Sequence, residues 1–155
     1  PVPSAVGVDQ IKLAGVLGLS VIIGRVGAGM LLDRFWAPGI CAAVFLLPIV
    51  GFNMLYIDQP AVWQLASAVA LCGIAAGAEY DFLAYFVARY FGLANYGKIF
   101  SLIILPLTIA TSAGAILGGR VLDETGSLNA VVPAFTIATL FAAALPLALG
   151  RYPRQ

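Results

Sequence analysis

Histidine is absent from this 155-residue chain, and charged side chains make up only 10% of it. Histidine is the commonest metal ligand and the side chain best suited to act as a base at neutral pH, so we expect no metal, no cofactor and no enzymatic activity. The two cysteines, Cys41 and Cys72, lie inside apolar runs. They are interpreted as small buried residues rather than as a disulfide framework. A formal net charge of +1 gives no indication of a nucleic-acid partner.

The rest of the composition is strongly apolar. Hydrophobic residues make up 62% of the chain, and its mean hydropathy is +1.02. Soluble domains are nearer half apolar and a quarter charged. A soluble fold with this composition would expose apolar surface and aggregate. The composition therefore predicts a membrane protein whose main surroundings are the lipid bilayer.

Five apolar stretches are near the roughly 20 residues that a helix needs to cross about 30 Å of hydrocarbon. They cover about residues 9–30, 39–57, 61–90, 97–119 and 129–150. Prolines within them are tolerated because neighbouring helices can satisfy the freed carbonyl groups. The predicted fold is an all-α, polytopic membrane bundle of five transmembrane helices with short connections. The chain begins without an initiator methionine, as a fragment would.

The basic residues gather on one side of the predicted membrane. The loops after the first and third spans, with the C-terminal tail, hold Arg25, Arg34, Arg89, Lys98, Arg151 and Arg154. The opposite side holds only Lys12 and Arg120, together with several acids. Positive residues favour the cytoplasmic face. We therefore expect a multi-pass protein of the cell (inner) membrane with its N-terminus outside and its C-terminus in the cytoplasm.

The segment Gly24–Phe35, GRVGAGMLLDRF, is interpreted as a glycine-broken turn between the first two spans. Gly29, Leu31, Asp33 and Arg34 in it resemble the signature loop of the major facilitator superfamily, roughly G-x-L-x-D-R. That loop joins the second and third helices of each six-helix half. The WAP sequence that follows departs from the fuller family motif, which continues with glycine and two basic residues.

Two further segments extend the resemblance. Gly77–Leu102 is similar to the tenth helix and following loop of the oxalate/formate and monocarboxylate-type branch, and Gly118–Ser127 resembles the outer end of the eleventh helix. The resemblance implies helices eight to twelve, without the N-terminal half or the first helix of the C-terminal half. Because the family halves are repeats, helices two to six would look similar.

The resemblance implies a secondary transporter that works by alternating access. Its expected solute is a small organic anion, monocarboxylate-like, moved with proton coupling or by exchange. A proton-driven drug exporter of the same superfamily is the alternative, and an intramembrane acid without a cationic neighbour would favour it. A membrane-embedded enzyme and a passive structural bundle are the remaining classes.

Two acids, Glu79 and Asp81, lie within the third span, where acids are costly and face a partner or a water-filled path. Side chains two positions apart on a helix point about 160° away from each other. We expect Arg25 or Arg34 to hold Asp81, and Glu79 to lie closer to the transport path and exchange a proton. A purely structural ion pair is the alternative for both acids.

The remaining site predictions concern a solute-binding site and a cytoplasmic gate. Tyr85 is expected to bind a carboxylate solute, and Arg89 is the only deep cation available for an anion. The family resemblance implies that Asp33 latches onto a helix N-terminus or Arg89. The other residues assigned to this cytoplasmic gate are Gly24, Arg25, Gly29 and Arg34.

Small and polar residues inside the spans suggest how the helices pack. Two glycine pairs at helical spacing, Gly73 with Gly77 and Gly114 with Gly118, predict close helix contacts. Helix-to-helix hydrogen bonds are expected for the intramembrane polar residues. These are Asn53, Gln64, Ser67, Thr108, Thr111 and Ser112.

Overall fold

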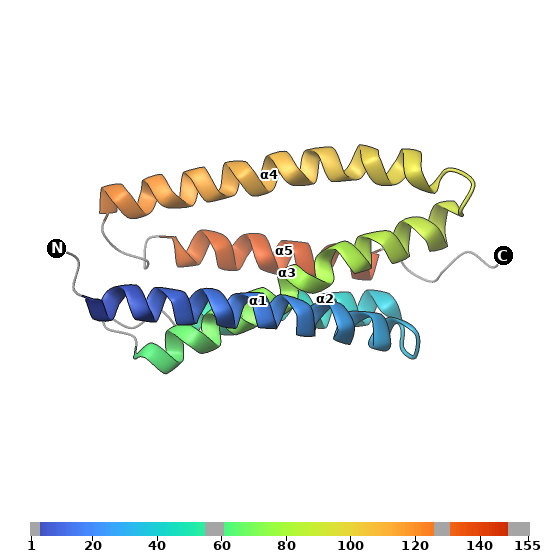
Figure 1. The fold of residues 1–155 in the computed structure, drawn as a ribbon. Coiled ribbons are helices and arrows are strands. Elements are labelled where there is room, and N and C mark those ends of the chain that lie inside the picture. Colours follow the sequence, from blue (N-terminus) through green and yellow to red (C-terminus); the bar gives the residue numbers. More distant parts are fainter. Residues whose placement is uncertain (1–3, 55–60, 126–130, 149–155) are drawn as a thin grey trace.

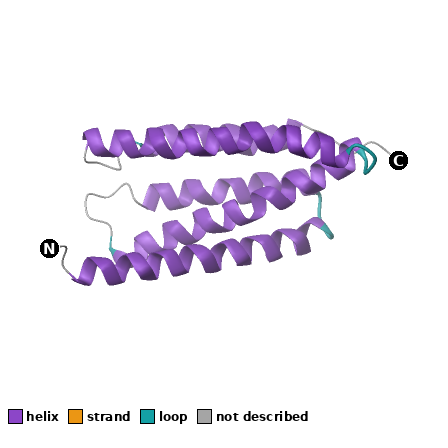
Figure 2. Ribbon diagram, turned by 45° about the horizontal axis from the view of Figure 1, so that its top comes forward, coloured by secondary structure: helices purple, strands orange, loops and turns teal. Residues whose placement is uncertain are grey.

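The computed structural model describes residues 4–54, 61–125 and 131–148, and all of its regular structure there is helical (Figures 1 and 2). The helices are α1 (Ser4–Leu32), α2 (Ala37–Met54), α3 (Val62–Phe91), α4 (Tyr96–Thr125) and α5 (Val132–Ala148). The all-α prediction is confirmed for these residues. Some predicted features lie outside the described residues. These are the connection at 58–60, the outer parts of the predicted spans 39–57 and 129–150, and the residues Arg151 and Arg154.

Four of the helices, α1 to α4, are long and apolar enough to cross a membrane. Helix α5 is equally apolar, but its 17 described residues fall short of the roughly 20 that a full crossing requires. The structure therefore agrees with a multi-pass membrane protein.

The helices run alternately up and down, so that the turns at 33–36 and 92–95 lie at the same end of the molecule (Figure 1). Arg34 and Lys98 are exposed at this end. Arg120 lies near the opposite end of α4, beside the exposed acids Asp123 and Glu124. The charge asymmetry seen in the sequence is thus also an asymmetry between the two ends of the bundle.

Single cysteines at the two ends are expected to label from opposite sides of the cell membrane. On a background without Cys41 and Cys72, we expect Phe35→Cys and Asn95→Cys to react only from the cytoplasmic side, because basic ends stay inside. Glu124→Cys is expected to react from outside. Labelling of intact cells with an impermeant maleimide measures this, and reaction of Phe35→Cys or Asn95→Cys from outside would contradict the orientation.

Helix α3 lies at the centre of the packing and contacts α1, α2 and α4, while α5 packs on α2. A buried cluster joins the first three helices near the 33–36 turn. It consists of Ala28, Leu32, Ala37, Cys41, Ala78 and Phe82. Among the described helices, the backbone of α4 comes close only to that of α3, and α4 has no buried residue in its apolar window, so it lies along the outside of the bundle (Figure 1).

The crossing of α1 and α3 depends on glycine. A Cβ atom at Gly24 would meet the backbone carbonyl of Ile74, and a Cβ atom at Gly77 would meet the backbone carbonyl of Val21. At Gly73 an added Cβ would come within 2.8 Å of the Ser20 side chain. The predicted packing role of Gly73 and Gly77 is confirmed, and their partner is α1.

The second glycine pair packs differently from the prediction. Gly114 has no neighbour within 4 Å of an added Cβ, and Gly118 meets only the Phe135 ring, at 3.6 Å. The expectation of a close helix contact at this pair is wrong, because α4 is held away from α5 by aromatic side chains. Both glycines instead line a space between the two helices.

The segment Gly24–Phe35 is mostly helix, contrary to the predicted glycine-broken turn. Helix α1 continues to Leu32, and only residues 33–36 form the turn. A helix satisfies its own backbone hydrogen bonds, which favours continuation in lipid, and Gly24 serves close packing rather than a break. Among the described glycines, positive φ occurs only at Gly92 (φ 75°), where α3 ends and the Gly92 N–H donates to the Ala88 carbonyl.

Candidate functional site

A cavity of about 620 Å³ lies between α2, α3, α4 and α5. Helix α2 contributes Phe45 and Phe52 to its lining, α3 contributes Cys72, and α5 contributes Phe135 and Thr139. Helix α4 closes one side with small residues, among them Ala110, Thr111, Gly114 and Ala115. The absence of bulky side chains on this part of α4 leaves the space that larger residues would fill.

Glu79 is the only charged residue in the lining of this cavity. It also lines a second, smaller cavity of about 370 Å³ that lies nearer the 33–36 turn and is otherwise apolar apart from Cys41. No lysine or arginine is among the residues that line either cavity. The structure places Glu79 away from Asp81, on a face of α3 that lines these two cavities, and its nearness to a transport path stays a prediction.

Asp81 is on the other face of α3 and is paired with α1. Its Oδ2 lies 3.6 Å from Nε of Arg25. The Asp81 side chain is 32% exposed and that of Arg25 58% exposed, so the pair is at the edge of the α1–α3 contact rather than inside it. The prediction that Arg25 or Arg34 holds Asp81 is confirmed for Arg25. One acid therefore joins two helices, and the other faces a cavity.

Tyr85 and Arg89 form a pair one turn apart near the end of α3. Nε of Arg89 donates to the Tyr85 hydroxyl at 3.4 Å, and the guanidinium carbon lies 5.7 Å from the Tyr85 ring centroid. Neither residue lines the two cavities that contain Glu79. The structure thus places both of them apart from the space around Glu79.

The residues assigned to a cytoplasmic gate are not brought together as one cluster. Asp33 and Arg34 are exposed at the turn, whereas Gly24 is buried against α3 and Arg25 is paired with Asp81. Gly29 has open space around it. In the described part of the chain the Asp33 carboxylate makes no ion pair with Arg89, so the latch stays a prediction.

The intramembrane hydroxyl groups bond within their own helices instead of between helices. Thr111 donates to the Leu107 carbonyl at 2.9 Å, and Thr139 donates to the Phe135 carbonyl at 2.7 Å. The same pattern holds for Asn53, Ser67, Thr108 and Ser112. Gln64 accepts the Ala61 N–H at the start of α3. The prediction of helix-to-helix bonds is wrong for these residues because i−4 carbonyls lie nearer than any other helix.

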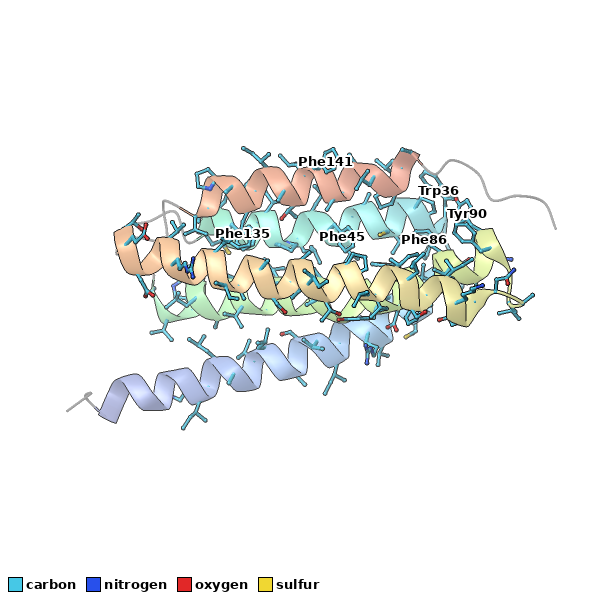
Figure 3. The ribbon with its side chains drawn as sticks, turned by 90° about the horizontal axis from the view of Figure 1, so that it is seen from above. Trp36, Phe45, Phe86, Tyr90, Phe135 and Phe141 are labelled. Carbon is cyan, nitrogen blue, oxygen red and sulfur yellow. The ribbon has the colours of Figure 1, made fainter. Side chains whose placement is uncertain are left out.

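Sequence reasoning missed the parts of the cavity that come from α2 and α5. Phe45, Phe52, Phe135 and Ala142 line it, yet nothing in their local sequence separates them from ordinary apolar residues. In Figure 3, Phe135, Phe45 and Phe86 lie in a row beside α4, whereas Phe141 points away from it. The sequence of α4 gives a partial signal, because residues 110–115 form an unbroken run of small side chains.

Comparison of the chain with protein-family models, with curated proteins and with solved structures finds no match.

Proposed function

We propose that this chain is part of a secondary active transporter that works by alternating access and couples solute movement to protons through Glu79. The observation that supports this most is a single carboxylate facing a cavity of about 620 Å³ between four helices. A charged residue inside a membrane bundle is costly and usually marks an ion or substrate pathway. A passive structural bundle gives no reason to keep Glu79 facing this space.

The five helices fit the proposal as part of a major facilitator half. Members of that superfamily have two six-helix halves that rock about a site near the membrane midplane. In the proposal the remaining helices come from another part of the same polypeptide and cover the exposed face of α4, the least buried helix. The resemblance of Gly29, Leu31, Asp33 and Arg34 to the family loop adds support.

The cavity lining bears on the class of solute. An organic anion needs a cationic partner, and the lining offers none, so a monocarboxylate would depend on an arginine from the other half. An apolar organic cation needs only an apolar wall and a carboxylate, both of which are present. We therefore propose organic cations as the second candidate solute class, with export driven by protons.

Glu79→Gln is expected to abolish the dependence of transport on the pH gradient. The amide keeps the shape of the side chain but cannot take up or release a proton. Uptake or efflux of a panel of organic anions and cations by proteoliposomes with the complete polypeptide, with and without a pH gradient, measures this.

Glu124→Gln is the matched control, because Glu124 is exposed at the end of α4 and is expected to keep the pH response. A Glu79→Gln protein with unchanged proton coupling would remove Glu79 from the mechanism. A complete polypeptide that moves none of the panel in either condition would count against the transporter proposal itself.

A further inference from the structure

Two cavities meet at three side chains. The larger cavity, about 620 Å³, and the smaller one, about 370 Å³, share Phe45 of α2, Glu79 of α3 and Ala142 of α5 in their linings. These three residues come from three different helices. The point where the cavities adjoin is therefore surrounded on three sides by this chain.

The two cavities extend from this junction in opposite directions along α3. The larger one continues past Ala76 and Ala75 to Cys72, and the smaller one continues past Phe82 and Leu83 to Phe86. In the membrane orientation expected from the basic residues, the smaller cavity lies towards the cytoplasm. Together they follow α3 from Cys72 to Phe86, a distance of about 21 Å along the helix at 1.5 Å per residue.

We propose that Phe45, Glu79 and Ala142 form a constriction that controls passage between the two cavities and favours cations. The ring of Phe45 has a fixed place, because it packs edge-on against Phe82 with the ring centroids 6.0 Å apart, and Phe82 is only 1% exposed. Ala142 has the smallest side chain after glycine, so the opening beside it is as wide as a side chain allows. Glu79 supplies the only charge.

This inference rests on the proposed function for the role of Glu79 in proton coupling. The constriction itself can be tested without measuring transport. Each side of the junction can carry one reporter cysteine. Cys72 is half-buried and lines only the larger of the two cavities, whereas Leu83 is half-buried and lines only the smaller, so that Leu83→Cys reports on that side. Cys41 is 1% exposed in the buried cluster and is therefore replaced by alanine. The rates at which thiol reagents modify the two reporter cysteines report access to each side.

The experiment uses the complete polypeptide in sealed vesicles on a Cys41→Ala background, with either Cys72 alone or the pair Cys72→Ala and Leu83→Cys. An impermeant, positively charged methanethiosulfonate is added on the side from which Cys72 reacts. We expect the thiol of Leu83→Cys to react about tenfold more slowly than Cys72 from that side. Phe45→Ala is expected to raise the Leu83→Cys rate about tenfold, and Ala142→Phe to lower it by a similar factor, while the Cys72 rate stays the same.

Matched controls are available on the same helices. Leu46→Ala and Ala144→Phe change exposed positions that line neither cavity and are expected to leave both rates unchanged. Ala142→Val replaces Ala142→Phe if the larger residue prevents folding. An unchanged Cys72 rate shows in each variant that the bundle is intact.

The charge of the reagent tests the contribution of Glu79. We expect the cationic methanethiosulfonate to reach the thiol of Leu83→Cys about tenfold faster than the anionic sulfonate reagent, because a carboxylate in an apolar passage concentrates cations. Glu79→Gln is expected to remove this difference.

Several outcomes would overturn the constriction. These are equal rates at the Leu83→Cys thiol and at Cys72 without further substitution, no reaction of Cys72 from either side, or no response of the Leu83→Cys rate to Phe45→Ala and the Ala142 variants. Equal access of both reagents would overturn the charge selection alone. A transport panel that fails while these labelling results hold would contradict the proposed function and leave the constriction standing.

Discussion

Alanine at Gly77 or Gly24 is expected to separate α1 from α3 and to lower the free energy of unfolding by about 1–3 kcal/mol for each substitution. The added Cβ at Gly77 would overlap the Val21 carbonyl, and that at Gly24 would overlap the Ile74 carbonyl. Both obstacles are backbone atoms, which cannot rotate away as a side chain can. The helices must therefore move apart along the contact that holds α1 in the bundle.

Gly27→Ala provides the control on the same helix, because an added Cβ there meets nothing within 4 Å. It is expected to be neutral or slightly stabilising, since alanine is a better helix former than glycine. Unfolding in mixed detergent micelles, followed by circular dichroism or by a cysteine crosslink between α1 and α3, measures all three variants. Equal stability of Gly77→Ala and Gly27→Ala would contradict the close crossing.

Loss of Arg25 is expected to cost more than loss of its partner. Arg25→Ala leaves Asp81 without its cation about 15 Å from the end of α3 (ten residues at 1.5 Å). We expect the free energy of unfolding to fall by about 2 kcal/mol. This is somewhat less than the cost of placing a charge at the centre of a helix in lipid, because the pair is partly exposed. Asp81→Asn is milder, because the long side chain of Arg25 can extend to the nearer membrane surface.

The double variant Arg25→Ala/Asp81→Asn separates this explanation from a simple loss of contact. Removing both charges leaves no unpaired ion, so the double variant is expected to recover to within about 1 kcal/mol of the parent. Arg34→Ala, at an exposed turn position, is the control and is expected to have little effect. If the double variant is no more stable than Arg25→Ala, then Arg25 stabilises the protein by a contact other than its ion pair with Asp81.

Much of the fold follows from local features of the sequence. Apolar stretches of the right length predict the helices, and the small residues Gly73 and Gly77 predict a close contact on one face of α3. The 160° separation of Glu79 and Asp81 is a property of any α-helix, which explains why their opposite placement could be predicted. The sequence left both Arg25 and Arg34 as candidate partners of Asp81, and the structure has Arg25 in that place.

The features that the sequence did not predict depend on more than one helix. Gly24 has the sequence context of a turn but the role of a packing residue, because its partner Ile74 is fifty positions away in the chain. Gly114 and Gly118 have the spacing of a packing pair, yet Phe135 keeps α5 from approaching. The cavity around Glu79 requires side chains from four helices, and no single stretch contains the information to assemble them.

The length of α4 gives the bilayer itself a part in the behaviour of this bundle. Its apolar part, the predicted span 97–119, extends about 34 Å at 1.5 Å per residue, against a hydrocarbon core of about 30 Å. A hydrophobic stretch longer than the hydrocarbon core is thick can tilt, and the tilt changes with the lipid. Helix α4 has few contacts to resist such a change, and it supplies one wall of both cavities. Membrane thickness would therefore alter the room beside Glu79 without any change in the amino-acid sequence.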